Sequence, residues 1–343
     1  MVKSLGSDNH SGIHPEILEA LIQTNYGHSP SYGTDELTEE VYKIFKSHFG
    51  EKAETFFVFN GTAANVLSIK CFLKSFESVL CAADSHLNLD ECGAPEAISG
   101  CKLIPLPSPE GKITVDQCRE ALIRLGDQHY SQPKMVSITQ PTELGTLYSY
   151  EEMKALSQFC KENSLYFHID GARFIHAAHQ LNKSFKELTQ DIGVDVLSFG
   201  GTKNGLLYGE AVIVFSKDKI RDLKFYRKQC LQLPSKMRFL STQFKALLDR
   251  DLWRKISQKE CELASYLAEK VASIPEVKVF QKVQANSVFV KLPKEWVKPL
   301  RNSHFFYIWN EKDWSARWMM SFDTEREDLD EFVNKILELR GES

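Results

Sequence analysis

The feature of this chain that most restricts its fold is a repeated alternation of short apolar runs with amphipathic stretches, from about residue 55 to residue 215. Most of the runs are continuously apolar, as expected of strands that helices cover on both faces. Strands that alternate with helices in this way favour a mostly parallel sheet in an α/β domain. We expect seven such strands, at residues 55–59, 78–82, 102–106, 135–139, 165–169, 195–199 and 211–215.

The pattern changes beyond about residue 245, where a long helix is expected over residues 246–273. A last helix is expected to open at a Thr324–Glu327 capping box. The strands expected between these helices lie near 276–280, 286–291, 304–309 and 315–321. We therefore expect a large α/β domain that includes the N-terminal segment, residues 1–245, and a small C-terminal α+β domain, residues 246–343.

Charge and composition argue against several classes of function. The 343 residues carry a formal net charge of −4, which gives no electrostatic reason to expect nucleic acid or an anionic membrane as a partner. No apolar run is long enough to span a bilayer, and the N-terminus lacks the apolar core of a signal peptide. Eight cysteines occur without C-x-x-C spacing, which favours a reducing compartment. We therefore expect a cytoplasmic protein.

Ligands of an open parallel sheet bind at the carboxyl ends of its strands, so the residues that follow each expected strand are candidates for a site. Gly61 and Thr62 follow the first strand and run into a helix, whose N-terminus offers free N–H groups to an anion. The candidates that follow later strands are His86, Asp170, Arg173 and the glycine-flanked Lys203. Taken singly, each has an ordinary explanation, such as a tight turn, a surface histidine or a helix cap.

Taken together, these residues fit the requirements of pyridoxal phosphate. This cofactor needs a lysine amine for an imine, a carboxylate that keeps the pyridine nitrogen protonated, and a helix N-terminus for its phosphate. It also gains from a flat group over the ring. The residues that supply these four functions are Lys203, Asp170, the Gly61-Thr62 turn and His86.

A metal site is not expected. His176 and His179 lie at i, i+3 spacing on one expected helix, but the sequence offers no third ligand at suitable spacing.

Ordered motifs along essentially the whole chain resemble the threonine aldolase and β-eliminating lyase family of pyridoxal-phosphate enzymes. The resemblance is strongest to the bacterial branch of low-specificity L-threonine aldolases, and it implies the type I fold, which is the aspartate-aminotransferase-like fold. The motifs that carry it are SDNHSG (7–12), YGTDELTE (32–39), FNGTAAN (59–65), DECGAPE (90–96), TQPTELGT (139–146), HIDGARF (168–174), SFGGTKNGLLYGEA (198–211), SKMRFLS (235–241) and ARWMMSFDT (316–324).

The resemblance implies roles for individual residues. Lys203 would bind the cofactor covalently, Asp170 would pair with the pyridinium nitrogen, and His86 would stack on the ring. The residues implied around the cofactor are Gly61, Thr62, His86, Asp170, Arg173, Thr202 and Lys203. Those implied to bind the substrate are Ser7, Arg173 and Arg317, with Tyr32 contributed by a neighbouring subunit of a homotetramer. Either Arg227 or Arg238 would reach a neighbour's phosphate.

The implied reaction is a retro-aldol cleavage of L-threonine or L-allo-threonine to glycine and an aldehyde. One departure concerns the base: other branches carry a histidine in an E-N-T-H-N segment, where this chain has Thr142-Glu143-Leu144. The base is therefore open between His86, Glu143 and water. Alternatives on the same scaffold are a β-eliminating lyase, an aminotransferase and a non-catalytic pyridoxal-phosphate-binding protein.

Overall fold

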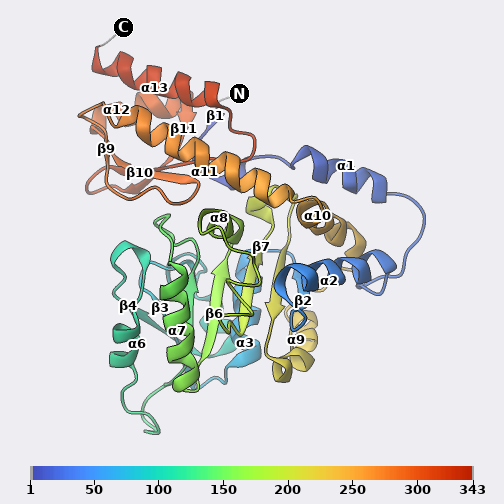
Figure 1. Ribbon diagram of the computed structural model, residues 1–343. Coiled ribbons are helices and arrows are strands. Elements are labelled where there is room, and N and C mark those ends of the chain that lie inside the picture. Colours follow the sequence, from blue (N-terminus) through green and yellow to red (C-terminus); the bar gives the residue numbers. More distant parts are fainter. Residues whose placement is uncertain (1–2, 342–343) are drawn as a thin grey trace.

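The computed structural model describes residues 3–341, and its centre is a seven-stranded sheet (Figure 1). Its strands are β2 (Glu54–Val58), β3 (Glu77–Ala82), β4 (Lys102–Leu106), β5 (Gln132–Thr139), β6 (Tyr166–Gly171), β7 (Val196–Gly200) and β8 (Glu210–Val214). They lie in the order β2-β8-β7-β6-β5-β3-β4. Only β8 runs against the others in this sheet, so the expected mostly parallel α/β sheet is confirmed.

All seven expected strands are present in this sheet. Residues 102–106 match β4 at both ends, and β5 begins three residues earlier than expected, at Gln132. The continuous apolar runs are explained by burial: every residue of β7 and β8 is buried, which requires helices on both faces of the sheet.

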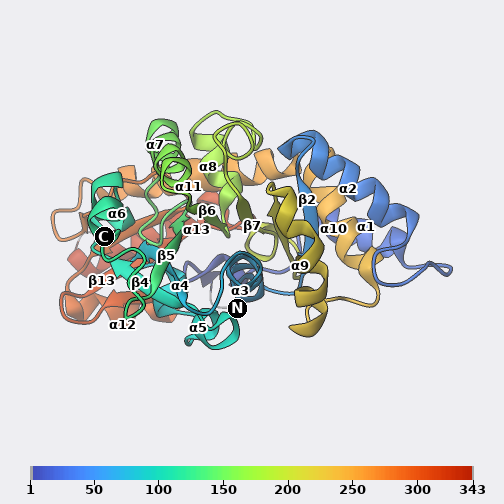
Figure 2. The same ribbon diagram turned by 90° about the horizontal axis from the view of Figure 1, so that it is seen from below.

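Helices cover both faces of the sheet (Figure 2). Helices α3 (Gly61–Phe72) and α9 (Lys217–Gln229) pack on one face. The opposite face is covered by α2 (Glu36–Phe49), α7 (Tyr150–Glu162) and α10 (Met237–Asp249). The remaining helices of this part are α1 (Pro15–Thr24), α4 (His86–Leu89), α5 (Ala94–Ser99), α6 (Val115–Ala121) and α8 (Phe174–Gln180).

A smaller layer formed by the C-terminal part lies over the edge of the main sheet (Figure 1). It contains an antiparallel sheet in the order β12-β13-β10-β9. Its elements are α11 (Leu252–Val271), β9 (Lys278–Val279), β10 (Ser287–Lys291), α12 (Lys294–Ser303), β11 (His304–Phe305), β12 (Tyr307–Asn310), β13 (Ser315–Met319) and α13 (Arg326–Arg340). These elements enclose a separate apolar core around the buried Trp318.

Two expectations for this layer were wrong in detail. The helix expected over residues 246–273 is instead α10 followed by α11, because Asp251 lies between them in the left-handed region at φ 53°. The capping box of the last helix is Glu325 with Asp328, since the Thr324 hydroxyl instead accepts a hydrogen bond from the Ser321 N–H at 3.0 Å. No helix in residues 3–341 has the length and apolar character needed to cross a membrane.

The first described residues of the N-terminal segment, residues 3–5, pack against the C-terminal layer. Strand β1 (Lys3–Ser4) pairs in parallel with β11, and the Leu5 N–H donates to the Phe305 carbonyl at 2.7 Å. Leu5 is buried in the C-terminal core, and its carbonyl accepts from the Met319 N–H at 2.8 Å. The residues that follow it are thereby brought to the carboxyl edge of the main sheet.

Candidate active site

A cavity of about 220 Å³ lies at the carboxyl ends of β2, β6 and β7. The candidates from the sequence that line it are Gly61, Thr62, His86, Asp170, Thr202 and Lys203. The cavity is also lined by Asn9, Asn65, Glu91, Glu143 and Glu210. Residues at or after the carboxyl ends of five strands, β2, β3, β5, β6 and β7, thus meet at one place, as the parallel sheet requires.

The N-terminus of α3 forms one side of the cavity. Asn60 caps this helix, and its Oδ1 accepts from the Ala63 N–H at 2.9 Å. The first N–H groups of an α-helix have no partner within the helix, and they attract an anion. A side chain at Gly61 would meet no atom within 4 Å, so open space adjoins these N–H groups. An anionic group of a ligand fits there.

Asp170 is buried near the end of β6, and its carboxylate is held on both oxygens. Oδ1 accepts from the Ala172 N–H at 3.2 Å, and Oδ2 accepts from Asn65 Nδ2 at 2.8 Å. These bonds fix the direction in which the carboxylate faces a ligand.

His168 supports the same strand from within the core. Its ring lies between the hydroxyls of Ser137, at 2.8 Å, and Ser198, at 3.0 Å. Burial lowers the pKa of His168 to about 4, so this imidazole is neutral near pH 7. It therefore acts as a hydrogen-bonded core residue.

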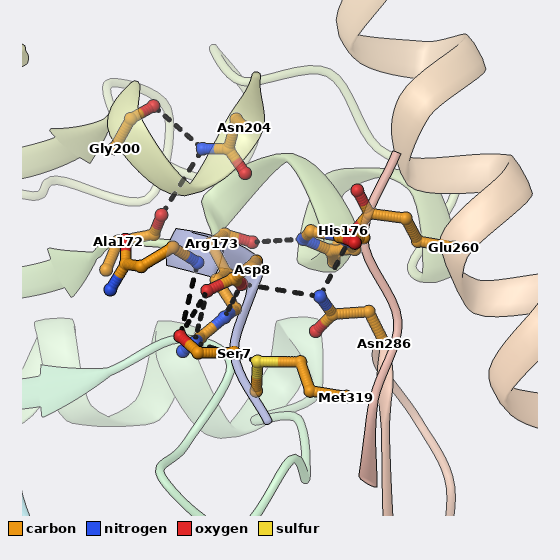
Figure 3. Close-up of polar contacts among 12 residues, drawn as sticks. Ser7, Asp8, Ala172, Arg173, His176, Gly200, Asn204, Glu260, Asn286 and Met319 are labelled. Atoms are coloured by element: carbon orange, nitrogen blue, oxygen red, sulfur yellow. Dashed lines mark hydrogen bonds and ion pairs between the residues drawn. The ribbon is translucent and has the colours of Figure 1, made fainter. Parts of the chain in front are cut away.

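Lys203 lies on a short 3₁₀ turn that follows β7. Asn204 fixes this turn, because its Nδ2 donates to the Gly200 carbonyl at 2.8 Å and to the Ala172 carbonyl at 3.2 Å (Figure 3). A Cβ at Gly200 would collide with the Ala172 carbonyl, so the close approach of the two strand ends requires glycine. The Lys203 amine is thereby placed in the same cavity as Asp170.

A buried carboxylate, Glu210, supports the lysine turn from β8. It accepts a hydrogen bond from the Gly201 N–H at 2.7 Å, and burial raises the pKa of Glu210 to about 7. The Thr202 hydroxyl accepts from the Gly209 N–H at 3.0 Å. The predicted phosphate neighbour Thr202 therefore lines the cavity with its hydroxyl oxygen already engaged within the fold.

His86 opens the short helix α4 and lies beside a second carboxylate. Its Nδ1 is 2.9 Å from Oε1 of Glu91, and this hydrogen bond raises the pKa of His86. Asn65 Nδ2 donates to the same Oε1 at 2.8 Å.

Arg173 and Arg317, both expected to bind a carboxylate, differ in how they are partnered. Arg173 Nε donates to Asp8 Oδ2 at 2.5 Å, and its Nη2 donates to Asp8 Oδ1 at 3.0 Å (Figure 3). Burial opposes ionisation of Asp8, but the charge of Arg173 outweighs it and lowers the pKa of Asp8. Ser7 directly precedes this aspartate and lies beside the pair (Figure 3).

Arg317, on β13, has donor capacity to spare. Its Nη2 donates to the Gly6 carbonyl at 3.3 Å, while its buried Nε has no hydrogen-bond partner within residues 3–341. A buried N–H group without a partner costs about 1–3 kcal/mol, so a ligand carboxylate at this position would be bound favourably.

A chain of buried polar side chains continues from Asp8 into the C-terminal layer (Figure 3). Asn286 Nδ2 is 3.5 Å from Asp8 Oδ2 and 3.0 Å from Glu260 Oε2. His176 Nε2 lies 2.6 Å from the same Glu260 oxygen. His176 is therefore engaged with a helix of the other layer, and it holds Arg173 through the Arg173 carbonyl at 3.2 Å from its Nδ1.

The lining of the cavity does not include Ser7, Arg173 or Arg317, nor three further residues implied by the resemblance, Tyr32, Arg227 and Arg238. Tyr32 is 50% exposed, in the loop before α2. Arg227 is buried, and its Nη1 donates to the Phe57 carbonyl at 3.3 Å. Arg238 lies nearer the surface, where its Nη1 donates to Ser29 Oγ at 3.0 Å.

Among the site residues that received no role from the sequence are Asp8, Asn65, Glu91 and Glu210. Each lies inside a motif that carried the family resemblance, so a signal was present. Their function was not visible because each acts on a side chain or turn that only the fold brings next to it.

Comparison with known proteins decides the family. A family model described as "Beta-eliminating lyase" matches residues 4–294. The chain belongs to the β-eliminating lyase family. It is 40% identical over 340 residues to the low specificity L-threonine aldolase of Pseudomonas aeruginosa, a match that covers 99% of this chain and 98% of that protein. A low specificity L-threonine aldolase of another Pseudomonas strain is 41% identical over 335 residues, which is 97% of each protein.

Solved structures of the same family agree with the fold. The threonine aldolase of Leishmania major superposes with a TM-score of 0.93 at 26% sequence identity, over 98% of this chain and 99% of that one. The family expected from the motifs and its type I α/β fold are confirmed, and this chain is a lyase.

Proposed function

We propose that this chain binds pyridoxal phosphate on Lys203 and cleaves L-threonine and L-allo-threonine to glycine and acetaldehyde. The observation that carries the proposal is that one cavity is lined by an amine, a buried carboxylate, an imidazole and a helix N-terminus. The names of the Pseudomonas and Leishmania relatives support the choice of substrate.

The residues present fit the cofactor. The open space at Gly61, beside the N–H groups of α3, suits a phosphate. The carboxylate of Asp170, fixed by two hydrogen bonds, suits a protonated ring nitrogen, and the imidazole of His86 suits the ring face. Pyridoxal phosphate, when bound, would take up the electron pair of the bond broken at the substrate α-carbon.

The protein's own residues would bind and orient the substrate. The spare Nε of Arg317 supports its role in holding the substrate carboxylate with charge-assisted hydrogen bonds. Arg173 has Nε and Nη2 on Asp8, so we assign its remaining Nη1 to the carboxylate beside Ser7. A carboxylate held at two points fixes which bond at the α-carbon is oriented for cleavage. His86 lines the cavity and is our candidate for the base that takes the β-hydroxyl proton.

The test is acetaldehyde release from L-threonine and from L-allo-threonine, coupled to NADH oxidation by alcohol dehydrogenase. Lys203→Ala should abolish release together with the visible absorbance of bound cofactor. Lys312→Ala, which changes an exposed lysine of the C-terminal layer, is the matched control and should retain both. Release of acetaldehyde by Lys203→Ala at the wild-type rate would refute the assignment.

The products separate this reaction from the alternatives. Pyruvate and ammonia would indicate β-elimination, and a keto acid formed by amino exchange would indicate an aminotransferase. Cofactor absorbance without turnover of any amino acid would indicate a non-catalytic binding protein.

We also propose that the protein is a cytoplasmic homotetramer with sites completed at subunit contacts. Large apolar side chains are exposed on the described part of the chain, notably Tyr26 at 80% and Leu231 at 83% exposure, which supports a surface that a neighbouring subunit covers. Of the two candidate arginines, Arg238 is the one near the surface, and we assign it to a neighbour's phosphate. All eight cysteines are free thiols, which supports a reducing compartment. Light scattering coupled to size exclusion tests the assembly.

A further inference from the structure

A buried network of hydrogen bonds connects two of the acidic side chains of the site, Asp170 and Glu91, with the imidazole of His86. Asn65, on the second turn of α3, donates from Nδ2 to Oδ2 of Asp170 and to Oε1 of Glu91, each at 2.8 Å. That Glu91 oxygen is also 2.9 Å from Nδ1 of His86. One amide thus orients both carboxylates, and one of these carboxylates binds the imidazole.

The two ends of the imidazole have different surroundings. The Glu91 side chain is 0% exposed, whereas the His86 side chain is 30% exposed and lines the cavity. Within residues 3–341, Nδ1 of His86 has a hydrogen-bond partner, the carboxylate of Glu91, which is an acceptor. The Nδ1 end is therefore closed by Glu91, and the Nε2 end is free for a ligand.

The charges around Glu91 indicate why it is placed there. It lies beside a second carboxylate, Asp170, and its Oε2 is buried without a partner among the described residues. A buried carboxylate next to another one is costly unless a positive or donating group compensates it. The donors that do so are Asn65 and His86. In an ordinary surface ion pair, the carboxylate would be exposed to water and would not need an imidazole to compensate its charge.

We propose that Glu91 is a positioning residue that keeps a proton on Nδ1 of His86 and leaves Nε2 unprotonated toward the cavity, ready to accept the β-hydroxyl proton of the substrate. The second half of this proposal rests on the proposed aldol cleavage, and the first half does not. In the step, the substrate O–H bond breaks, an N–H bond forms at Nε2, and the aldehyde carbonyl forms as the Cα–Cβ bond breaks. The positive charge on His86 then faces the Glu91 carboxylate, and the proton is available for the α-carbon that becomes glycine.

Other charged groups that face His86 also affect its pKa. Asp170 and Glu143 favour the protonated imidazole, and Lys203 disfavours it. Among these groups, Glu91 makes the direct hydrogen bond and raises the pKa of His86 most. A neutral substitute of the same shape at Glu91 should therefore change the titration of His86 more than one at Glu143.

The test is hydrogen–deuterium exchange at Cε1 of each histidine in the full-length protein, read by peptide mass spectrometry as a function of pH. The exchange midpoint of His86 is expected above the ordinary histidine value of about 6.5. Glu91→Gln should lower this midpoint by about one pH unit or more, a tenfold change in proton affinity. Glu143→Gln is the matched control and should lower it by less. A wild-type midpoint at or below about 6.5, or an unchanged midpoint in a folded Glu91→Gln protein, would overturn the proposal.

Steady-state kinetics of acetaldehyde release test the second half. In Glu91→Gln the acidic limb of the kcat profile should move to lower pH by the same amount as the exchange midpoint of His86, with KM little changed. A midpoint that moves without the acidic limb would overturn the proton-accepting role of His86. If the wild-type protein releases no acetaldehyde, the proposed function fails, while the exchange experiment still decides whether Glu91 positions His86.

Discussion

Replacing His168 with asparagine should change how the stability of the protein depends on pH. The wild-type ring is fully buried between Ser137 and Ser198, and burial lowers its pKa from 6.5 to about 4. Between these two values the unfolded chain binds a proton at His168 and the folded protein does not. The free energy of unfolding therefore falls as the pH drops from about 6.5 to about 4. Asparagine can keep one hydrogen bond but does not titrate.

The magnitude follows from the two pKa values. The difference between 6.5 and about 4, at 1.36 kcal/mol per pH unit, corresponds to about 3 kcal/mol of stability lost on acidification. Glu210 works in the opposite direction, because burial raises its pKa from 4.5 to about 7. Its folded form binds the proton more tightly, so this group adds about 3 kcal/mol as the pH falls through that range. The two contributions largely cancel in the wild-type protein between about pH 4.5 and 6.5, and only variants separate them.

The assay is urea unfolding of wild type, His168→Asn and Glu210→Gln at several pH values from 4 to 8. Relative to wild type, His168→Asn should gain about 3 kcal/mol on acidification, whatever its stability at neutral pH. Glu210→Gln should lose a similar amount over its own range. If the difference between His168→Asn and wild type is the same at pH 4 and pH 7.5, the buried ring is not held neutral and the reasoning is refuted.

Three further substitutions test the site and its support. Arg317→Leu should raise KM for L-threonine by roughly 10- to 150-fold, equivalent to about 1.5–3 kcal/mol for a charge-assisted contact, and an unchanged KM in steady-state kinetics would contradict its role. Asp8→Ala leaves a buried guanidinium unpaired and should cost about 3–5 kcal/mol in urea unfolding, whereas Asp116→Ala removes an exposed ion pair and should change little. Gly200→Ala should lower the melting temperature and the soluble yield because of its backbone collision, while Gly12→Ala, which has open space around it, should do neither.

The main sheet was predictable from sequence because strands buried on both faces leave continuous apolar runs, as in β8. The C-terminal layer was less so. Asp251 separates α10 from α11 by adopting a left-handed conformation, which the neighbouring residues in the sequence do not predict. Helix α12 was missed because Pro299 lies inside it, and an internal proline is typical of a helix end.

In the candidate site, too, the sequence predicts some residues and not others. Lys203 and Asp170 could be found because each lies at or just after the carboxyl end of a strand, and the parallel sheet brings such residues together. The partner of Arg173 could not, since Asp8 is 165 residues away in sequence and arrives through the pairing of β1 with β11. The role of Glu91 could not be predicted because it depends on a hydrogen bond from the side-chain amide of Asn65, which lies on a different helix.

The pairing of β1 with β11 has a consequence for synthesis of the chain. Lys3 is made about 300 residues before its strand partner His304. At about 5–20 residues per second, the N-terminal segment waits roughly 15–60 s before that partner is made. Throughout this time Leu5 lacks the apolar core that buries it, and Asp8 lacks the strand pairing that brings it to Arg173. The ion pair beside the cavity is thus completed only after His304 has been made, and a bulky tag fused ahead of Lys3 should interfere with the pairing of β1 with β11.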